Sequence, residues 1–329
     1  MIARGQQKYK NRMMNTDCPY PYRTLFGPVL SRRLGVSLGV DLVPHKTCTL
    51  DCVYCECGAT THLTLRRKEY VSVDRVKAEL RKYLSHNEKI DYITFSGSGE
   101  PTLNDGIGEI IQFLKSDYPG YKVAVLTNST LFDRLAVREQ VKNADVVMAS
   151  LDAGTDQCFR QVNRPHPQLD LQGVIDGISA FGKTFDGRLL LEYFAVGNVN
   201  DSDEDLQQLK EIFQRIDSKG IVVNTLDRPG TKGWVRPVDA NRLRVISEFL
   251  GNAEVVKYPS CNHPVGERRH GDLMARLVDT VRRRPYTARD VSQIMGLDVE
   301  TVKPMLDRLV ASNRLVSKRM NRGLFYSAA

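Results

Sequence analysis

Long apolar runs are absent from this chain of 329 residues. A membrane-spanning helix needs about eighteen or more consecutive apolar residues, and no such run occurs. The first fifteen residues, MIARGQQKYKNRMMN, are basic but lack the apolar stretch of a secretory signal. Internal repeats and low-complexity tracts are missing as well. We therefore expect a cytoplasmic globular protein that does not contact a membrane.

Cysteine is scarce, and the total of seven is odd. Disulfides are rare in a reducing cytosol, where clustered cysteines usually serve metal or redox chemistry. Four of the seven lie in the segment 46–58, KTCTLDCVYCECG, and three of them have the spacing C-x3-C-x2-C. These three, hereafter the cysteine triad, are Cys48, Cys52 and Cys55. Their crowding indicates a metal centre.

Acidic residues are fewer than basic ones, which gives a formal net charge of +8. This excess weakly favours an anionic partner such as nucleic acid. Apolar residues make up 41% of the chain, enough for a sizeable core. At about 150 residues per domain, the length predicts one large domain and a smaller one.

Six segments rich in Val, Ile and Leu read as buried strands, and helical patterns lie between most of them. The strands are predicted at 36–43, 91–95, 122–128, 145–152, 188–196 and 221–227. Strand–helix alternation predicts an α/β fold with a parallel sheet and right-handed crossovers. Six units fit a partial (β/α)6 barrel better than a closed barrel of eight. We expect this barrel at 31–264, after an N-terminal extension at 1–30.

The composition changes after about residue 265. Thr287 can cap a helix at 288–295 that Gly296 ends, and a second helix follows at 300–313. Two short strands then surround the turn at 321–323. Helices followed by a β-hairpin predict a C-terminal winged helix-turn-helix domain at 265–329.

The cysteine triad follows the first predicted barrel strand, and barrel active sites lie at the carboxyl ends of strands. Three interpretations compete. A structural zinc site would take Cys57, His45 or His62 as fourth ligand. A structural [4Fe–4S] cluster would take Cys57 as a fourth thiolate. A [4Fe–4S] cluster with only three thiolates would leave one iron open to a substrate.

The triad, with Tyr54 before its last cysteine, resembles the CxxxCxΦC signature of the radical SAM superfamily. The resemblance implies that the triad holds three irons and that S-adenosylmethionine (SAM) chelates the fourth. An electron from the reduced cluster then cleaves SAM to a 5′-deoxyadenosyl radical, which abstracts a substrate hydrogen. It also implies anaerobic activity and a reducing partner such as flavodoxin or ferredoxin.

Further motifs follow the triad in the family's order. SGSGEPTLN at 96–104 resembles the glycine-rich motif that hydrogen-bonds the SAM amino group, and LTNST, SLD and NRPH end or follow later strands. Taken singly, each is an ordinary turn or helix cap. By resemblance, the residues expected to bind SAM are Tyr54, Ser98, Gly99, Glu100, Asn128, Ser150, Asp152 and Asn163. Arg164 is expected to face SAM or substrate, or else to lie on the surface.

The segment 26–55 is similar to one branch, the wyosine-biosynthesis-like Fe–S oxidoreductases (tRNA 4-demethylwyosine synthase-like). Its characterised members rebuild a methylated guanosine in tRNA and carry a second cluster on three N-terminal cysteines. Here only Cys18 precedes the triad. A second cluster from Cys18, Cys57 and Cys261 stays an alternative. Cys261 is also the candidate catalytic thiol, with a buried free cysteine as the other interpretation, and Cys158 is expected in the core.

From residue 270 onward, eleven basic residues stand against six acidic ones. The cluster 282–284 precedes the predicted turn, and Lys318, Arg319 and Arg322 fall on the predicted hairpin, where they could hold phosphates. We expect an enzyme whose radical modifies RNA or tRNA. One alternative is a glycyl-radical activase or peptide-modifying enzyme that docks a protein. Another is a DNA-binding regulator that uses the cluster and SAM as a sensor.

Overall fold

The computed structural model describes residues 22–86, 89–256 and 273–328. Cys18 and Cys261, most of the expected N-terminal extension and the expected domain boundary at 264/265 lie outside these ranges. No helix in the described ranges is long and apolar enough to cross a membrane.

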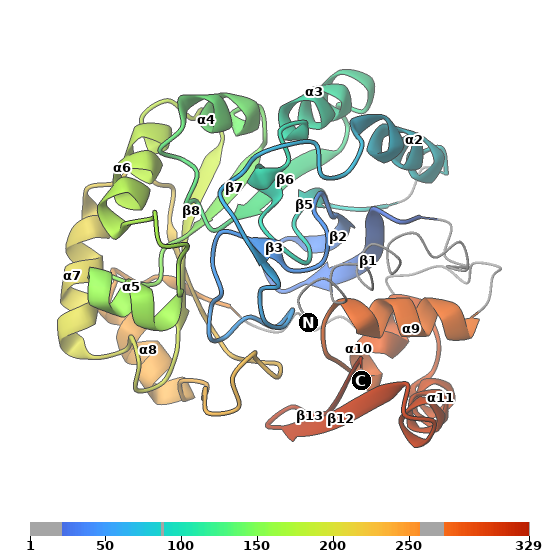
Figure 1. Cartoon of the computed structure of the whole chain (residues 1–329). Helices are drawn as coiled ribbons and strands as arrows, with labels where there is room; N and C mark the ends of the chain where they lie inside the picture. The colour runs from blue at the N-terminus through green and yellow to red at the C-terminus, as the bar shows by residue number, and fades with distance from the viewer. Residues whose placement is uncertain (1–21, 87–88, 257–272, 329) are drawn as a thin grey trace, which may run out of the picture.

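The main element is an eight-stranded sheet that curls into an open half-barrel (Figure 1). Its strands, in spatial order, are β1 (Leu25–Ser31), β2 (Gly35–Val40), β5 (Tyr92–Phe95), β6 (Lys122–Thr127), β7 (Val146–Ser150), β8 (Arg188–Ala195), β9 (Ile221–Thr225) and β10 (Glu254–Val255). The strands from β2 to β10 are parallel, as the alternating sequence predicts. All six predicted strands are confirmed, each shorter than expected.

The first strand, β1, was not predicted. It pairs antiparallel with β2, from Leu25 opposite Val40 to Ser31 opposite Gly35, with an irregular register between Phe26 and Val29. The sequence LFGPVLS carries a Gly-Pro pair that reads as a turn. Proline is tolerated here because β1 is the edge strand of the sheet.

Helices cover the outer face of the half-barrel (Figure 1). They are α2 (Val73–Leu84), α3 (Ile107–Asp117), α4 (Leu135–Val141), α5 (Asp156–Val162), α6 (Leu171–Gly182), α7 (Asp203–Gln214) and α8 (Ala240–Phe249). The sequence sets several of their starts: the side chains of Asp170, Ser202 and Asp239 each accept a hydrogen bond from the backbone N–H three residues on. One continuous apolar core fills the space between these helices and the sheet.

The C-terminal unit has a small apolar core, to which Val29 of the edge strand β1 also contributes. Its elements are α9 (Leu273–Arg283), β11 (Tyr286–Thr287), α10 (Ala288–Met295), α11 (Val299–Ala311), β12 (Leu315–Met320) and β13 (Gly323–Ala328). Thr287 and Asp290 form a reciprocal capping box at the start of α10, and Gly296 ends it at a φ of 67°. Both predicted helices and the hairpin are present. The assignment to the winged-helix class stays a prediction.

The C-terminal unit contacts the half-barrel at both sides of its opening. Arg283, at the end of α9, lies 3.4 Å from Asp41, which directly follows β2. Arg322, in the β12–β13 turn, pairs with Asp227, which follows β9. Because β2 and β9 lie near opposite ends of the sheet order, the unit bridges the carboxyl ends of distant strands.

Candidate functional site

The cysteine triad lies in a compact loop above the carboxyl ends of the strands. Cys48 ends the short strand β3 (Thr47–Cys48), which pairs with β4 (His62–Leu63). Cys55 N–H donates to the Cys52 carbonyl at 3.2 Å, so the last two cysteines lie on one turn. All three side chains are free thiols, and besides burial the nearby charge of Cys55 raises the pKa of both Cys48 and Cys52. The structure thus brings the predicted triad together.

Each triad sulfur accepts a hydrogen bond from a different polar side chain. The donors are Asn128 Nδ2 to Cys48 at 3.5 Å, Asn163 Nδ2 to Cys52 at 3.5 Å, and Lys46 Nζ to Cys55 at 3.0 Å. Cys57 behaves differently, because its thiol donates to the Gly97 carbonyl at 3.6 Å. Donors directed at sulfur stabilise thiolates, the form that binds metal. The triad therefore fits a three-thiolate cluster, with Cys57 as a neighbouring donor.

The thiols differ in their ionisation. A hydrogen bond from Cys57, assisted by Lys46, lowers the pKa of Cys55 to about 5. Burial raises the pKa of Cys48 to about 11 and that of Cys52 well above its ordinary value. Within the described ranges, no group of three Cys, His, Asp or Glu side chains is arranged around one metal ion. A mononuclear zinc ion would need such a group, whereas the thiolates of an iron–sulfur cube each bind a different iron.

The glycine-rich segment packs directly against the strand that carries Cys48. Its backbone donates from Glu100 N to the Thr47 carbonyl at 3.1 Å, and its Ser98 carbonyl accepts from Lys46 N at 2.8 Å. A Cβ at Gly99 would lie only 2.0 Å from the Thr47 oxygen, so this approach requires glycine. Ser98 Oγ donates to Asp41 Oδ2 at 2.6 Å.

Glu100 links the ends of β5 and β6. Its buried carboxylate accepts from Thr102 Oγ1 at 2.6 Å, from Thr127 Oγ1 at 2.7 Å and from Asn128 N at 2.8 Å. Burial raises its pKa. These bonds hold Asn128 beside Cys48, where its side chain also donates to Thr49 Oγ1 at 2.8 Å. Glu100 therefore fixes the position of another predicted SAM residue.

Asp152, after β7, joins three segments of the site. Its Oδ2 accepts from Tyr54 OH at 2.5 Å and from Asn163 Nδ2 at 2.6 Å, and its Oδ1 accepts from Phe194 N at 2.9 Å. Burial raises the pKa of Asp152 to about 6, against these hydrogen bonds. The Tyr54 ring stacks on Phe194 with centroids 3.9 Å apart. Ser150, two residues before Asp152, is the last residue of β7 and is half-buried.

The structure also places two other predicted residues, Arg164 and Cys158. Arg164 has a φ of 48°, and its side chain is half-exposed. Its guanidinium pairs with Asp51 of the cysteine loop at 3.2 Å. Cys158 is buried in α5, as expected for a core residue. The candidate thiol Cys261 lies outside the described residues, as does part of the alternative second cluster.

Several polar residues of the site were not found from the sequence. Arg33, in the β1–β2 turn, pairs with Glu192 of β8, and Asn224 of β9 donates to the same carboxylate at 3.0 Å. The sequence shows two consecutive arginines, Arg32 and Arg33, after β1, but their spacing does not indicate that Arg33 meets Glu192. Lys46, two residues before Cys48, was not predicted as a site residue.

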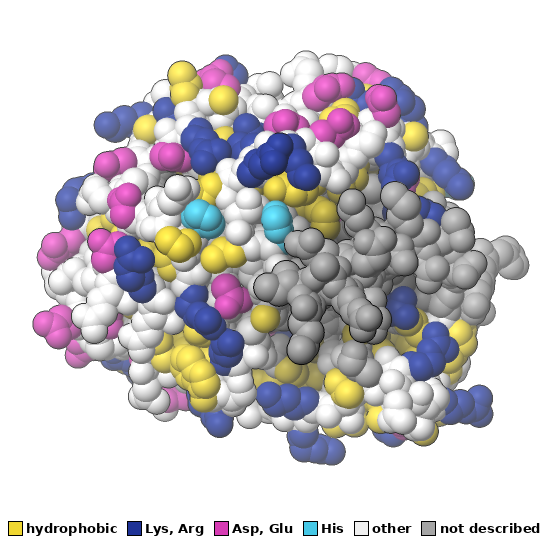
Figure 2. Space-filling model, in the orientation of Figure 1, with side chains coloured by type: hydrophobic (Ala, Val, Ile, Leu, Met, Phe, Trp, Pro, Cys, Tyr) yellow, Lys and Arg dark blue, Asp and Glu magenta, His cyan; other side chains and the backbone are white. Residues whose placement is uncertain are grey.

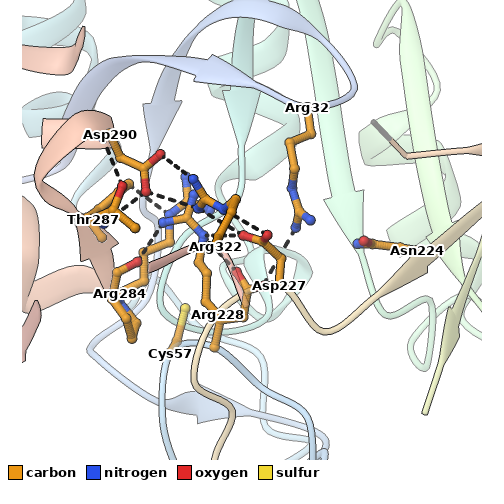
Figure 3. Close-up of polar contacts among 12 residues, drawn as sticks. Arg32, Cys57, Asn224, Asp227, Arg228, Arg284, Thr287, Asp290 and Arg322 are labelled. Carbon is orange, nitrogen blue, oxygen red and sulfur yellow. Dashed lines mark hydrogen bonds and ion pairs between the residues drawn. The ribbon is translucent and has the colours of Figure 1, made fainter. Parts of the chain in front are cut away.

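An arginine network connects the half-barrel to the C-terminal unit (Figure 3). Arg322 binds both oxygens of Asp227 and both oxygens of Asp290 at 2.9–3.0 Å. Arg228 donates to the Pro285 carbonyl at 2.6 Å and lies 3.4 Å from Glu56, next to the triad. Arg284 and Cys57 lie beside these residues.

The prediction that Arg322 holds phosphates is therefore wrong, because its guanidinium is already bound by two carboxylates. Arg283 and Arg284 are likewise turned toward Asp41 and Tyr286 rather than presented on a free surface. Arg282, Lys318 and Arg319 are exposed, as a phosphate contact requires.

Comparison with known proteins decides the family. The model described as the radical SAM superfamily matches residues 42–211, about half of the chain, including the triad and the motifs after it. The chain belongs to the radical SAM superfamily. Radical SAM enzymes use a [4Fe–4S] cluster and SAM, and the donor set at the triad fits such a cluster.

Three relatives show how far this likeness extends. A UPF0026 protein of Helicobacter pylori (strain J99) is 30% identical over 306 residues, which cover 92% of this chain and 97% of that protein. The protein named GTPase Obg of Brachyspira hyodysenteriae is 30% identical over 93% of this chain, which spans only 45% of that protein. The dual-specificity RNA methyltransferase RlmN 2 of Myxococcus xanthus is 27% identical over 56% of this chain and 50% of that protein.

Among solved structures, a radical SAM methyltransferase from Sphaerobacter thermophilus superposes with a TM-score of 0.55 at 17% identity. The match covers 68% of this chain and 67% of that one. At that identity the likeness supports the fold of this radical SAM enzyme and not its reaction.

Proposed function

We propose that this radical SAM enzyme modifies RNA, with the cysteine triad as the ligands of its cluster. The observation that carries the ligand assignment is the set of three separate side-chain donors, one to each triad sulfur, while Cys57 acts as a donor itself. Cys57 would then not be the fourth ligand, and the fourth iron would be open to SAM.

Bound here, the cluster and SAM would supply one-electron reductive cleavage of a C–S bond of SAM, with methionine as the leaving group. The chain's own residues orient SAM. The backbone at Ser98–Gly99 lies against the Cys48 strand, where its carbonyls can receive the SAM amino group. Glu100 holds Asn128, and Asp152 holds Asn163 and Tyr54, at the rim of the same site. Ser150 ends β7 and Asp152 follows it, where a ribose or carboxylate would bind.

RNA is supported first by relationship and charge. The relatives that match about half of this chain include proteins named RNA methyltransferases. Figure 2 shows Lys and Arg side chains along the lower edge of this face, in the region of β12 and β13. Lys318 and Arg319 of β12 are exposed there. A basic surface beside the barrel opening favours an anionic polymer.

The chain's single tryptophan, Trp234, adds an aromatic contact close to the triad. It is 53% exposed in the loop that follows β9. This loop is tied to the cysteine loop, because Thr231 Oγ1 donates to the Cys55 carbonyl at 2.9 Å and Lys232 N donates to the Val53 carbonyl at 3.2 Å. Arg236 Nη1 donates to the Gly233 carbonyl at 2.7 Å and stiffens the turn. A rigid exposed indole is a stacking platform for an unpaired base.

The finer assignments belong to this proposal. The C-terminal unit has the element order of a winged helix, and tRNA is the RNA suggested by the resemblance to the wyosine-biosynthesis branch. A DNA-binding regulator is disfavoured because the hairpin turn is bound to the half-barrel through Arg322, which leaves it poorly placed to enter a groove. A peptide or protein substrate is kept as an outcome of the test.

The test is anaerobic reconstitution with iron and sulfide, followed by measurement of 5′-deoxyadenosine with SAM and a chemical reductant. Total cellular RNA, its tRNA fraction and the same RNA after nuclease digestion are compared. We expect intact RNA to raise the yield and digested RNA not to. Equal yields with and without RNA would contradict an RNA substrate, and stimulation by protein extract alone would favour the peptide-modifying alternative.

Tryptophan fluorescence provides a second test that does not need turnover. Because Trp234 is the only tryptophan, any quenching by a single-stranded RNA oligonucleotide arises at this site. We expect Trp234→Leu to weaken RNA binding by about tenfold, the equivalent of one lost stacking contact. Leu135→Ala, which removes another exposed apolar side chain, is the matched control. Quenching by heparin as strong as that by RNA would contradict base stacking.

A further inference from the structure

Lys46 is a buried cation beside the cysteine triad. Its side chain is only 3% exposed, and its Nζ donates to Cys55 Sγ at 3.0 Å. Removing an ammonium group from water costs several kcal/mol unless an opposite charge and hydrogen bonds compensate. A lysine in this position therefore needs a negative partner.

Sulfur supplies that negative charge. Lys46 Nζ reaches Cys55 Sγ at hydrogen-bond distance, and as a thiolate this sulfur would carry the opposite charge. Among the described residues, Lys46 forms no ion pair with an Asp or Glu. Its charge is thus directed at the proposed cluster ligands.

The backbone of Lys46 is held in a strained conformation. Its φ of 56° lies in the left-handed region, which costs a residue with a side chain roughly 1 kcal/mol. Lys46 N donates to the Ser98 carbonyl at 2.8 Å, and its carbonyl accepts from Thr61 N and His62 N, each at 3.1 Å. The glycine-rich segment and the start of β4 therefore fix the lysine in place. Strain and a buried charge on one residue are typical of a functional position.

We propose that Lys46 sets the reduction potential of the cluster bound by the triad. Reduction adds one negative charge to the cluster, and a fixed ammonium that hydrogen-bonds a ligand sulfur stabilises the more negative state. Lys46 thereby makes the electron that SAM cleavage requires easier to accept. This inference rests on the proposed triad ligands and is independent of whether the substrate is RNA.

The test compares wild type with Lys46→Met, Lys46→Gln and Lys46→Arg, and uses Lys89→Met, at an exposed lysine, as control. Each protein is reconstituted anaerobically, its iron and sulfide are measured, and the cluster is titrated with dithionite and redox mediators in the absence of SAM and RNA. Electron paramagnetic resonance gives the reduced fraction. This readout reports the cluster itself, which a purely structural role of Lys46 would not shift at equal iron content.

We expect Lys46→Met to lower the ratio of reduced to oxidised cluster at a fixed potential by about tenfold, which corresponds to about 59 mV for one electron. Lys46→Gln keeps a hydrogen-bond donor without the charge, so its ratio of reduced to oxidised cluster should lie between those of Lys46→Met and wild type. Lys46→Arg and Lys89→Met should match wild type. Equal potentials for Met and wild type at equal iron content would overturn the inference.

Cluster loading provides a second discriminating result. If Lys46→Met binds no iron while Lys46→Arg does, the charge is needed even to hold the anionic cluster, which supports the inference. Equal loss in Met and Arg variants would overturn it, because charge would then not matter. A wild type that binds no iron would overturn the ligand assignment and this inference together. RNA-independent SAM cleavage would contradict the proposed substrate and leave Lys46 unaffected.

Discussion

The cysteine loop and the arginine network lie side by side but are held by different physics. Around the triad, each sulfur accepts a hydrogen bond from a polar side chain, and two of these three donors, Asn128 and Asn163, are neutral amides. In the arginine network, full charges pair directly, and Arg322 binds two carboxylates at once. The first arrangement prepares sulfur for a metal cluster. The second joins the half-barrel to the C-terminal unit, which also packs its apolar core against Val29 of β1.

The two regions also differ in how they depend on the chain. The triad is contained in a few consecutive residues, whereas Arg322 and Asp227 are 95 positions apart and Arg283 and Asp41 are 242 apart. A local motif can be damaged without unfolding the protein. A long-range ion pair, by contrast, contributes to the stability of the whole assembly of elements.

The largest expected effect separates the triad from its neighbour Cys57. Cys52→Ala should abolish the cluster, because two thiolates do not hold three irons. Cys57→Ala should retain it, since the Cys57 thiol donates to the Gly97 carbonyl and is not an acceptor. Iron and sulfide content and the absorbance of the reconstituted proteins measure this. Loss of the cluster in Cys57→Ala would favour the four-thiolate structural site.

Arg322→Met should destabilise the protein by about 4 kcal/mol, because two partly buried carboxylates lose a shared cation. Despite burial, the hydrogen bond from Arg322 lowers the pKa of Asp290. The corresponding stability is therefore present above the unfolded pKa of 3.8 and is lost as the pH falls below it. Chemical denaturation at pH 7 and at acid pH should show the difference between variant and wild type shrinking. A constant difference would contradict the ion pair.

Asp152 should show the opposite pH dependence. Burial raises its pKa from 3.8 to about 6, so the native state binds the proton more tightly than the unfolded state. This term stabilises the protein below about pH 4 and is lost as the pH rises through about 6, a change of about 2–3 kcal/mol. Asp152→Asn removes this titration, so the free energy of unfolding of the variant should change less with pH across that window. The free energy of unfolding of both proteins is measured from pH 4 to pH 7. An equal change with pH in the two proteins would contradict this.

An exposed ion pair provides the smallest effect and the contrast to Arg322. Lys303 Nζ lies 2.7 Å from Asp307 Oδ2 on the surface of α11, one helical turn away. Such pairs contribute about 0.3–0.5 kcal/mol, so Lys303→Ala should change stability only slightly, and salt should weaken even that. A thermal or urea unfolding difference as large as that of Arg322→Met would show that burial does not explain the contrast.

Much of the fold could be predicted because its signals are local. The six predicted strands are runs of β-branched residues with polar ends, and the triad and glycine-rich segment have fixed spacings. The edge strand β1 could not, because its Gly27-Pro28 pair is typical of a turn and only its place at the sheet edge permits it.

The polar contacts of the site were less predictable. Asn128, Asp152 and Asn163 were identified by their order after successive strands, and the structure places each in hydrogen bonds at the site. The role of Arg322 was predicted wrongly, since a basic residue in a hairpin turn suggests phosphate and the sequence does not reveal two acids that meet it. Partners of charged residues depend on tertiary proximity, which periodicity does not encode.

The contacts of the C-terminal unit with Asp41 and Asp227 have a consequence for engineering. Deleting 273–328 would take a counter-charge from the two flanks of the curled sheet simultaneously, so a truncated enzyme would not be the same catalyst in smaller form. Transplanting the unit onto another barrel would need acids at both flanks of the recipient. The two parts should therefore be exchanged between homologues only as a matched set.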